Sequence, residues 1–223
     1  MQIESFVLGD WQTNCWLVWG DSPDQSPPKA WIIDPGQVPL PVIARARELG
    51  LAVEAVLLTH AHVDHIAGVD EVRAALGSPP LCCHVAEQEW LGDPLLNLSA
   101  LAGMRVRAAQ ATRLLNGGET LPLGSSQWRV LHTPGHSPGG VTFVCDAERI
   151  AIVGDTLFAG SMGRIDLPGA DPEAMRHSLF EILLKLPDDY RVLNGHGPQT
   201  TIGRERRSNP FLRHGGDDWG EML

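Results

Sequence analysis

The chain has 223 residues, of which 43% are hydrophobic and 20% are charged, and its formal net charge is −10. This composition is ordinary for a soluble globular protein, and no apolar run approaches the roughly 18 residues that a membrane-spanning helix needs. The negative charge argues against a broad surface for nucleic acid or an anionic membrane. We therefore expect one domain over residues 1–223 that acts on a small molecule.

The first third of the chain alternates short apolar runs with polar or Pro-rich turns, a pattern typical of a β-meander. The N-terminus, Met1–Val7, lacks the basic and apolar regions of a secretory signal, which predicts a cytoplasmic location. The elements expected in this part are strands over Ile3–Leu8, Cys15–Trp19 and Ala30–Ile33, a helix over Val42–Leu49, and a buried strand over Val53–Leu58.

The later elements are predicted with the same periodicity rules. Residues 92–116 show no clear periodicity, and we expect either a helix or a flap over a site there, while residues 214–223 are expected to be a loose tail. The predicted elements are helices over Asp64–Leu76, Ala86–Leu91, Pro172–Leu186 and Ile202–Arg213, and strands over Leu81–Val85, Gln127–Thr133, Val141–Cys145, Ile150–Val153 and Arg191–Leu193.

Three histidines and one aspartate follow the strand that ends at Leu58, in the sequence THAHVDHIAGV. His60 and His62 are two residues apart, so in an extended segment their side chains point the same way and can bind one metal ion. Asp64 and His65 lie at a predicted helix start and diverge from that pair, which suits a second ion. The alternative is that Asp64 only caps the helix and the histidines are loop residues.

Polar residues also follow three later strands, in the sequences HTPGHSPGG, GDTLF and NGHGP. The first of these offers two histidines. We prefer His136 as a ligand because the Thr-Pro-Gly turn before it can aim it out of the sheet edge, whereas His132 still belongs to the strand. Asp155 either caps the following turn or uses its two oxygens to span two cations. His196 ends the last strand.

Two charged residues outside these sequences allow two interpretations each. Asp34 either orients a metal-bound histidine or simply initiates the Asp-Pro-Gly turn. Arg164 either pairs with a substrate carboxylate or fixes its own loop through an ion pair with Asp166 or Asp171.

The four cysteines show no CxxC spacing. Cys82, Cys83 and His84 together could be a soft-metal patch, but they fall in a predicted buried strand. We therefore expect structural, buried thiols.

Taken in order, the four sequences above resemble those of the metallo-β-lactamase-fold hydrolases and span residues 53–198. The resemblance implies an α/β (α+β) protein, a four-layer αββα sandwich with two divalent ions at one edge of its sheets. Zinc is favoured, with iron or manganese as alternatives. The implied ligands are His60, His62 and His136 for one ion and Asp64, His65 and His196 for the other, with Asp155 bridging both.

The resemblance also implies hydrolysis by a metal-bound hydroxide, with Asp64 and Asp155 as catalytic carboxylates. The stretches GDTLFAGSMGRIDLPGAD and TIGRERRSNPF are similar to short, single-domain bacterial relatives of glyoxalase II, the hydroxyacylglutathione hydrolases. We see no obvious general acid, and a thiolate, whose pKa is about 8.5, leaves without one. The expected substrate is thus a small thioester such as a hydroxyacylglutathione. The alternatives are a mononuclear iron persulfide dioxygenase, a lactonase and a phosphodiesterase.

Too few residues follow His196 for the C-terminal helical domain that contributes much of the glutathione site in full-length glyoxalase II. This departure from the full-length enzyme bears on which thiol the substrate carries.

Overall fold

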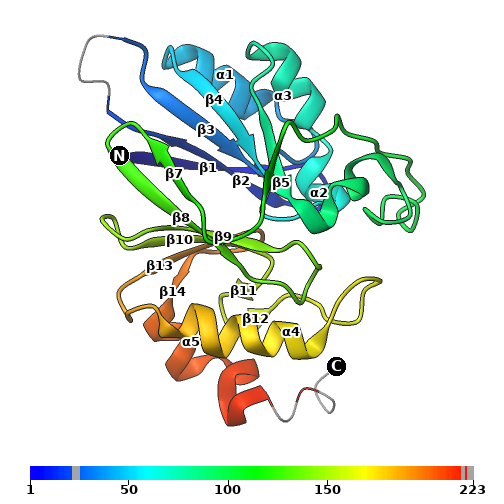
Figure 1. The fold of residues 1–223 in the computed structure, drawn as a ribbon, viewed down its shortest axis with the longest axis vertical. Helices are drawn as coiled ribbons and strands as arrows, with labels where there is room; N and C mark the ends of the chain where they lie inside the picture. The colour runs from blue at the N-terminus through cyan, green and yellow to red at the C-terminus, as the bar shows by residue number, and fades with distance from the viewer. Residues whose placement is uncertain (22–25, 217–218, 220–223) are drawn as a thin grey trace.

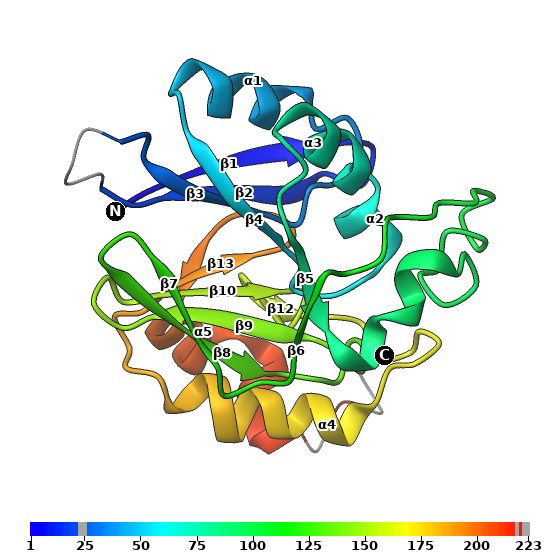
Figure 2. The ribbon, with the colours of Figure 1, turned by 45° about the horizontal axis from the view of Figure 1, so that its top comes forward.

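The computed structural model describes residues 1–21, 26–216 and 219, and in this part of the chain two six-stranded sheets pack face to face. Helices cover both outer faces, as Figures 1 and 2 show, with α1 and α3 on one side and α4 and α5 on the other. The four-layer αββα sandwich predicted from the sequence is confirmed.

The first sheet begins with the predicted antiparallel meander and continues with strands that run parallel to its third member. Carboxyl ends of parallel strands meet at one edge of a sheet, so the segments after β3 and β4 are brought together there. Its strands in spatial order are β1 (Gln2–Leu8), β2 (Thr13–Trp19), β3 (Lys29–Ile33), β4 (Ala52–Leu57), β5 (Leu81–His84) and β6 (Arg113–Leu115).

The second sheet contains one parallel pair, β10 and β13, whose carboxyl ends deliver Asp155 and His196 to the same edge. Its other neighbouring strands are antiparallel. A hairpin of β11 (Leu157–Phe158) and β12 (Ser161–Met162) follows Asp155. The strands in spatial order are β14 (Thr200–Thr201), β13 (Arg191–Asn194), β10 (Ile150–Gly154), β9 (Val141–Cys145), β8 (Ser126–His132) and β7 (Thr120–Leu123).

Three apolar layers hold the sandwich together. Between the sheets, large side chains such as Trp16, Trp128 and Phe143 are almost fully buried. One outer layer joins the first sheet to α1 (Leu40–Glu48) and α3 (Val69–Ala75), and the other joins the second sheet to α4 (Pro172–His177) and α5 (Ile202–Ser208). Burial of this apolar surface is the main force that fixes the two sheets, and hence their edges, relative to each other.

The helix predicted over Asp64–Leu76 is divided into α2 (Val63–Ile66) and α3. The division falls at Gly68, whose backbone N–H donates to the Pro35 carbonyl at 2.8 Å. A Cβ on Gly68 would lie 2.2 Å from the Gly36 carbonyl oxygen. The Asp-Pro-Gly turn therefore packs directly on the helix start, and only glycine permits that approach.

Two other predicted helices are less regular than expected. The segment predicted as Ala86–Leu91 forms two 3₁₀ turns, η1 (Val85–Glu87) and η2 (Glu89–Gly92). The amphipathic segment that begins as α4 continues as a π-turn, η3 (Ser178–Ile182), and a 3₁₀ turn, η4 (Leu183–Lys185). Strands β6, β7, β11, β12 and β14 were not predicted, because each is only two to four residues long, which is too short for periodicity to identify a strand.

The segment 92–116, left open between a helix and a flap, forms consecutive turns before β6 and extends beside α2 (Figure 2). The 3₁₀ turn η5 (Pro210–Gly216) follows α5. Within the predicted tail 214–223, residues 217–218 and 220–223 lie outside the described part. Trp219 is buried, and its indole N–H donates to the Phe211 carbonyl at 2.7 Å.

Among the described residues, no helix combines the length and the apolar composition that crossing a membrane requires.

Candidate metal centre

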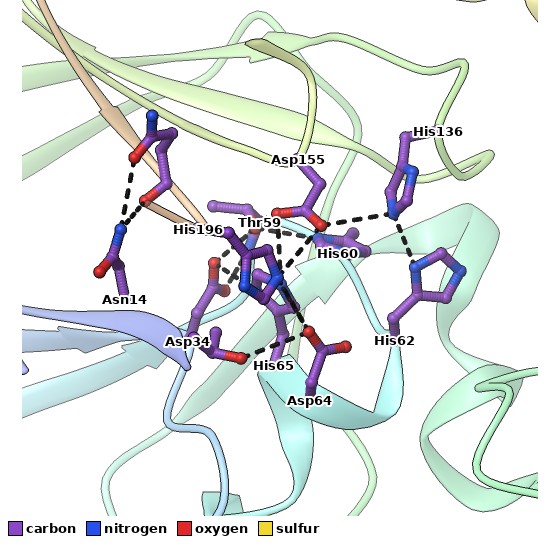
Figure 3. Close-up of polar contacts among 12 residues, drawn as sticks. Asn14, Asp34, Thr59, His60, His62, Asp64, His65, His136, Asp155 and His196 are labelled. Carbon is purple, nitrogen blue, oxygen red and sulfur yellow. Dashed lines mark hydrogen bonds and ion pairs between the residues drawn. The ribbon is translucent and has the colours of Figure 1, made fainter. Parts of the chain in front are cut away.

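The seven side chains predicted as ligands gather at the edge where the two sheets meet (Figure 3). Four of the five histidines are buried, and the remaining members are half-buried. The segments that contribute are the loop after β4 with His60 and His62, α2 with Asp64 and His65, the β8–β9 loop with His136, and the ends of β10 and β13 with Asp155 and His196.

The donor atoms of these residues form three groups, and within each group the atoms lie within 4.8 Å of one another. The first is His60, His62 and His136, in which His62 Nδ1 lies 2.9 Å from His136 Nε2. The second is Asp64, His65 and His196, in which His196 Nε2 lies 3.0 Å from Asp64 Oδ2. The third group, His60, His65 and Asp155, shares one member with each of the first two. The first two groups have the same members as the two ligand sets expected from the sequence, and the assignment of ions to them stays a prediction.

The Asp155 carboxylate lies between the two groups. Its Oδ1 is 3.4 Å from His65 Nε2, while its Oδ2 is 3.4 Å from His196 Nε2 and 3.6 Å from His136 Nε2. A single carboxylate thus faces donors of both groups. This is the arrangement that a bridging ligand requires, whereas a residue that only caps a turn would face backbone N–H groups.

Backbone carbonyls fix the ring orientation of two histidines. His136 Nδ1 lies 2.9 Å from the Arg164 carbonyl oxygen, and His196 Nδ1 lies 3.1 Å from the Trp11 carbonyl oxygen. A carbonyl can only accept, so each Nδ1 donates to its carbonyl, and each Nε2 is thereby turned towards the cluster.

A chain of contacts through Asp34 fixes two further histidines. Asp34 Oδ2 lies 2.9 Å from His65 Nδ1 and accepts a hydrogen bond from the Thr59 hydroxyl at 2.5 Å. The same hydroxyl lies 3.1 Å from His60 Nδ1. Because the hydroxyl donates to the carboxylate, it accepts from His60. Asp34 is almost fully buried, and its side chain makes these contacts in addition to its place in the Asp-Pro-Gly turn.

The electrostatics differ between the two groups. Burial, with the neighbouring histidines, holds the pKa of His60 well below its usual value and lowers the pKa of His62 to about 3. Burial also opposes protonation of His196, but hydrogen bonds to Asp155 and Asp64 raise its pKa to about 9. The first group is therefore neutral and ready to donate lone pairs, while the second pairs imidazole with carboxylate.

The unpaired atoms of the cluster test whether it fits metal ions. His60 Nε2, His65 Nε2 and Asp155 Oδ1 are buried and make no hydrogen bond within the described residues. A buried polar atom without a partner is costly, and these three face the cluster interior (Figure 3). Two divalent ions with nitrogen and oxygen ligands would satisfy them, so the donor set fits.

Glu87 is a residue of this centre that the sequence did not suggest. It is almost fully buried, and its carboxylate accepts from the backbone N–H groups of Ala61 and Gly139, at 2.5 and 2.7 Å. Burial raises the pKa of Glu87 despite these hydrogen bonds. The carboxylate thus joins the loop of His60 and His62 to the loop of His136. Gln88 and Glu89 follow Glu87 directly, so the local sequence did not distinguish it from its polar neighbours.

Strand β2 supports the segment that carries His196 and also contacts Asp64. The Asn14 side-chain amide donates to the carbonyls of Asn194 and Gly197 at 3.1 and 2.9 Å, on either side of His196 in the sequence. The Thr13 hydroxyl donates to Asp64 at 3.3 Å. The Asn14 contacts join positions about 180 residues apart, and the Thr13 contact joins positions 51 apart, so no local sequence pattern could have predicted them.

Other candidates lie outside the cluster. His132 stacks on His84, with ring centroids 4.1 Å apart, and its Nε2 is 2.9 Å from the Pro138 carbonyl oxygen. Cys82 packs between the sheets and Cys83 in the outer layer that joins the first sheet to α1 and α3, so the adjacent thiols point to opposite faces and cannot share an ion. The expectation of buried structural thiols is confirmed.

A cavity of about 550 Å³ opens onto the cluster. Arg164 lies at its edge, with its guanidinium in a two-point ion pair with Asp166 at 2.8 Å. This is one of the two interpretations that the sequence left open. The cavity is lined by Trp11, His62, Val63, Asp64, Leu98, Leu101, Ala102, His136, Asp155, Phe158, Ser161, Met162, Arg164, Leu167 and His196.

Comparison with known proteins identifies a family and several similar chains. The family model described as "Metallo-beta-lactamase superfamily" matches residues 8–196. Hydroxyacylglutathione hydrolase GloC of Haemophilus influenzae is 36% identical, over 95% of this chain and 98% of that protein. The crystal structure of BLEG-1 B3 metallo-beta-lactamase has a TM-score of 0.89 at 40% identity, covering 95% of this chain and 100% of that one. The crystal structure of TTHA1623 in a di-iron-bound form has a TM-score of 0.81 at 39% identity, covering 94% of this chain and 100% of that one.

Proposed function

The chain belongs to the metallo-beta-lactamase superfamily, and from this premise we propose that it is a dinuclear hydrolase of small thioesters. The broader class, a metal-dependent hydrolase, follows from the family. The observation that carries the proposal is the pair of donor groups with the Asp155 carboxylate between them. We further propose that the protein works in the cytoplasm on a small molecule.

We assign His60, His62 and His136 to one ion and Asp64, His65 and His196 to the other, with Asp155 shared. Neutral imidazoles and carboxylates suit zinc, and also iron or manganese. We favour zinc, and the di-iron form of TTHA1623 supports iron as the alternative. Both donor groups are complete, which favours the dinuclear hydrolase over a mononuclear persulfide dioxygenase.

Two divalent ions bound there would lower the pKa of a shared water from about 15.7 towards 7 and polarise the substrate carbonyl. Asp64 and Asp155 line the cavity and keep carboxylate oxygens beside the reacting atoms. We assign them to orient the attacking water and accept its proton. The Thr13 hydroxyl and His196 hold the Asp64 carboxylate in place for this task.

The cavity favours a leaving group that departs without a proton. Besides the cluster residues, Arg164 is the one ionisable side chain among the described residues of the lining, and it is paired with Asp166. An alkoxide or an amine needs a proton donor, whereas a thiolate, whose pKa is about 8.5, does not. The name of the relative GloC, a hydroxyacylglutathione hydrolase, supports the same substrate class.

The test begins with metal analysis of protein purified without added metal. Hydrolysis is then measured on thioesters, lactones, phosphodiesters and a β-lactam, and oxygen uptake is followed on glutathione persulfide. We expect two metal ions per chain and thioester cleavage without oxygen uptake. One iron per chain with oxygen uptake on the persulfide would establish the dioxygenase instead.

A ligand variant tests the metal assignment. His62→Ala removes one donor of the first group, and we expect metal affinity to fall at least about tenfold and thioester hydrolysis to be lost. Circular dichroism should remain unchanged. His177→Ala, at an exposed position on α4, is the matched control and should keep both properties. Full activity in a metal-depleted His62→Ala protein would refute the mechanism.

A further inference from the structure

We infer that the cavity takes an uncharged thioester with an apolar acyl group, and not a thioester of a charged thiol such as glutathione. The inference narrows the substrate of the proposed function and rests on it. It follows from the side chains beside the cluster and from the charges that the cavity lacks.

Apolar side chains form both walls of the cavity. Phe158 contacts the cluster directly, with its ring 6.1 Å from the His196 ring in an edge arrangement. A substrate carbonyl at the cluster would therefore lie beside apolar surface from two segments. One wall is Leu98, Leu101 and Ala102 from the turns after η2, and the other is Phe158, Met162 and Leu167 from the segment after β10.

The wall of leucines is fixed by buried polar contacts. Leu98 has a φ of +65°, a conformation that is strained for a residue with a branched side chain. Asn97 before it is fully buried, and its amide donates to the carbonyls of Trp90 and Val106, both at 3.0 Å. Its own carbonyl accepts from the Val63 N–H at 2.9 Å. The wall is thus tied to the helix that carries Asp64 and His65.

Leu101 has an exposed fraction of 68%, although it lines the cavity. A leucine held open to water in a fixed turn gains free energy only when apolar surface covers it. An apolar acyl chain that lies along this wall would provide that cover.

The charges of the cavity exclude a charged thiol. Glutathione carries two carboxylates, and binding them requires unpaired cations or N–H donors. Within the described lining, Arg164 is the one lysine or arginine, and Asp166 already occupies its guanidinium with two bonds of 2.8 Å. Carboxylates brought against leucine side chains would lose hydration without gaining a partner.

The substrate series that tests this inference varies one property at a time. Acetyl, butyryl, hexanoyl and octanoyl thioesters of uncharged N-acetylcysteamine are compared with the same acyl thioesters of glutathione. We expect kcat/KM to rise by up to about fourfold per added methylene until the cavity is filled. At equal acyl length, we expect glutathione thioesters to react at least about tenfold more slowly. A preference for glutathione, or no dependence on acyl length, would overturn the inference.

A pair of variants locates the effect. Leu101→Ser should lower kcat/KM for the octanoyl thioester by about three- to tenfold and leave the acetyl thioester nearly unchanged. Leu95→Ser is the matched control, because Leu95 has an exposed fraction of 70% in the same segment and does not line this cavity. Equal effects in the two variants would refute the assignment of the wall.

Binding to metal-free protein separates this inference from the proposed function. The probe is the octyl thioether of N-acetylcysteamine, which lacks the scissile carbonyl, and calorimetry measures its affinity. We expect binding that Leu101→Ser weakens and Leu95→Ser does not. If no thioester is cleaved but this pattern holds, the proposed function fails and the apolar site stands. Absence of binding would overturn the inference even if thioesters are cleaved.

Discussion

Replacement of Glu87 is the most informative perturbation of the centre, because this carboxylate touches no proposed ligand yet joins two ligand loops. Its two oxygens accept from the Ala61 and Gly139 N–H groups. Glu87→Ala leaves both donors buried without an acceptor. The carboxylate is so closely packed that a Cβ on Gly139 would lie 2.8 Å from its side chain, so the variant also leaves a void.

The magnitude follows from these contacts. Each hydrogen bond to a charged acceptor contributes about 1.5–3 kcal/mol, so two contribute about 3–6 kcal/mol. Removing the carboxylate also removes its burial cost, which is the cause of its raised pKa. We therefore expect Glu87→Ala to lower the free energy of unfolding by about 2–4 kcal/mol. Thermal unfolding should then occur roughly 5–15 °C lower for a chain of this size.

The assay combines thermal unfolding with metal affinity. Scans with and without a chelator give the loss of stability in both states, and competition with the chelator gives the affinity. Because the Glu87 carboxylate holds the loops that carry His62 and His136, we expect its removal to lower metal affinity about 10–100-fold. Glu89→Ala, at an exposed position two residues away, should change neither value. Wild-type stability and metal affinity in Glu87→Ala would refute the reasoning.

Two predictions concern titration. The pKa of His196 is raised to about 9 in the metal-free protein, so below that pH a proton competes with metal for its imidazole. Metal affinity should therefore fall by up to about tenfold for each pH unit below pH 9. Affinity independent of pH between 6 and 9 would contradict this. Burial raises the pKa of the thiols, to about 11 for Cys82 and about 12 for Cys83. A disulfide reagent at pH 8 should therefore modify the four cysteines only after denaturation. Modification of the native protein would disprove this prediction.

The helix interruptions show the limit of periodicity. The apolar spacing from Ile66 to Leu76 predicts one helix, and the spacing is indeed helical on either side of Gly68. The break comes from the Asp-Pro-Gly turn, more than 30 positions earlier, which occupies the space of a side chain at Gly68. A local pattern reports which face is buried and not what packs against it.

The sequence alone determined the fold and the composition of the cluster. Four short stretches at strand ends contain all seven proposed ligands, and the order of those stretches identified the family. Such prediction is possible because ligand type, strand-end placement and the two-residue spacing of His60 and His62 are local properties of the chain.

Only the tertiary structure decided what holds and surrounds the cluster. The Glu87 carboxylate, the Asn14 amide and the Trp11 carbonyl reach ligand loops from positions 26 to 185 residues distant. The apolar walls and the pairing of Arg164 with Asp166 likewise became visible only when separate segments met. Contacts between remote segments depend on how whole layers pack, and burial of the sandwich core sets that packing, so no short stretch of sequence encodes them.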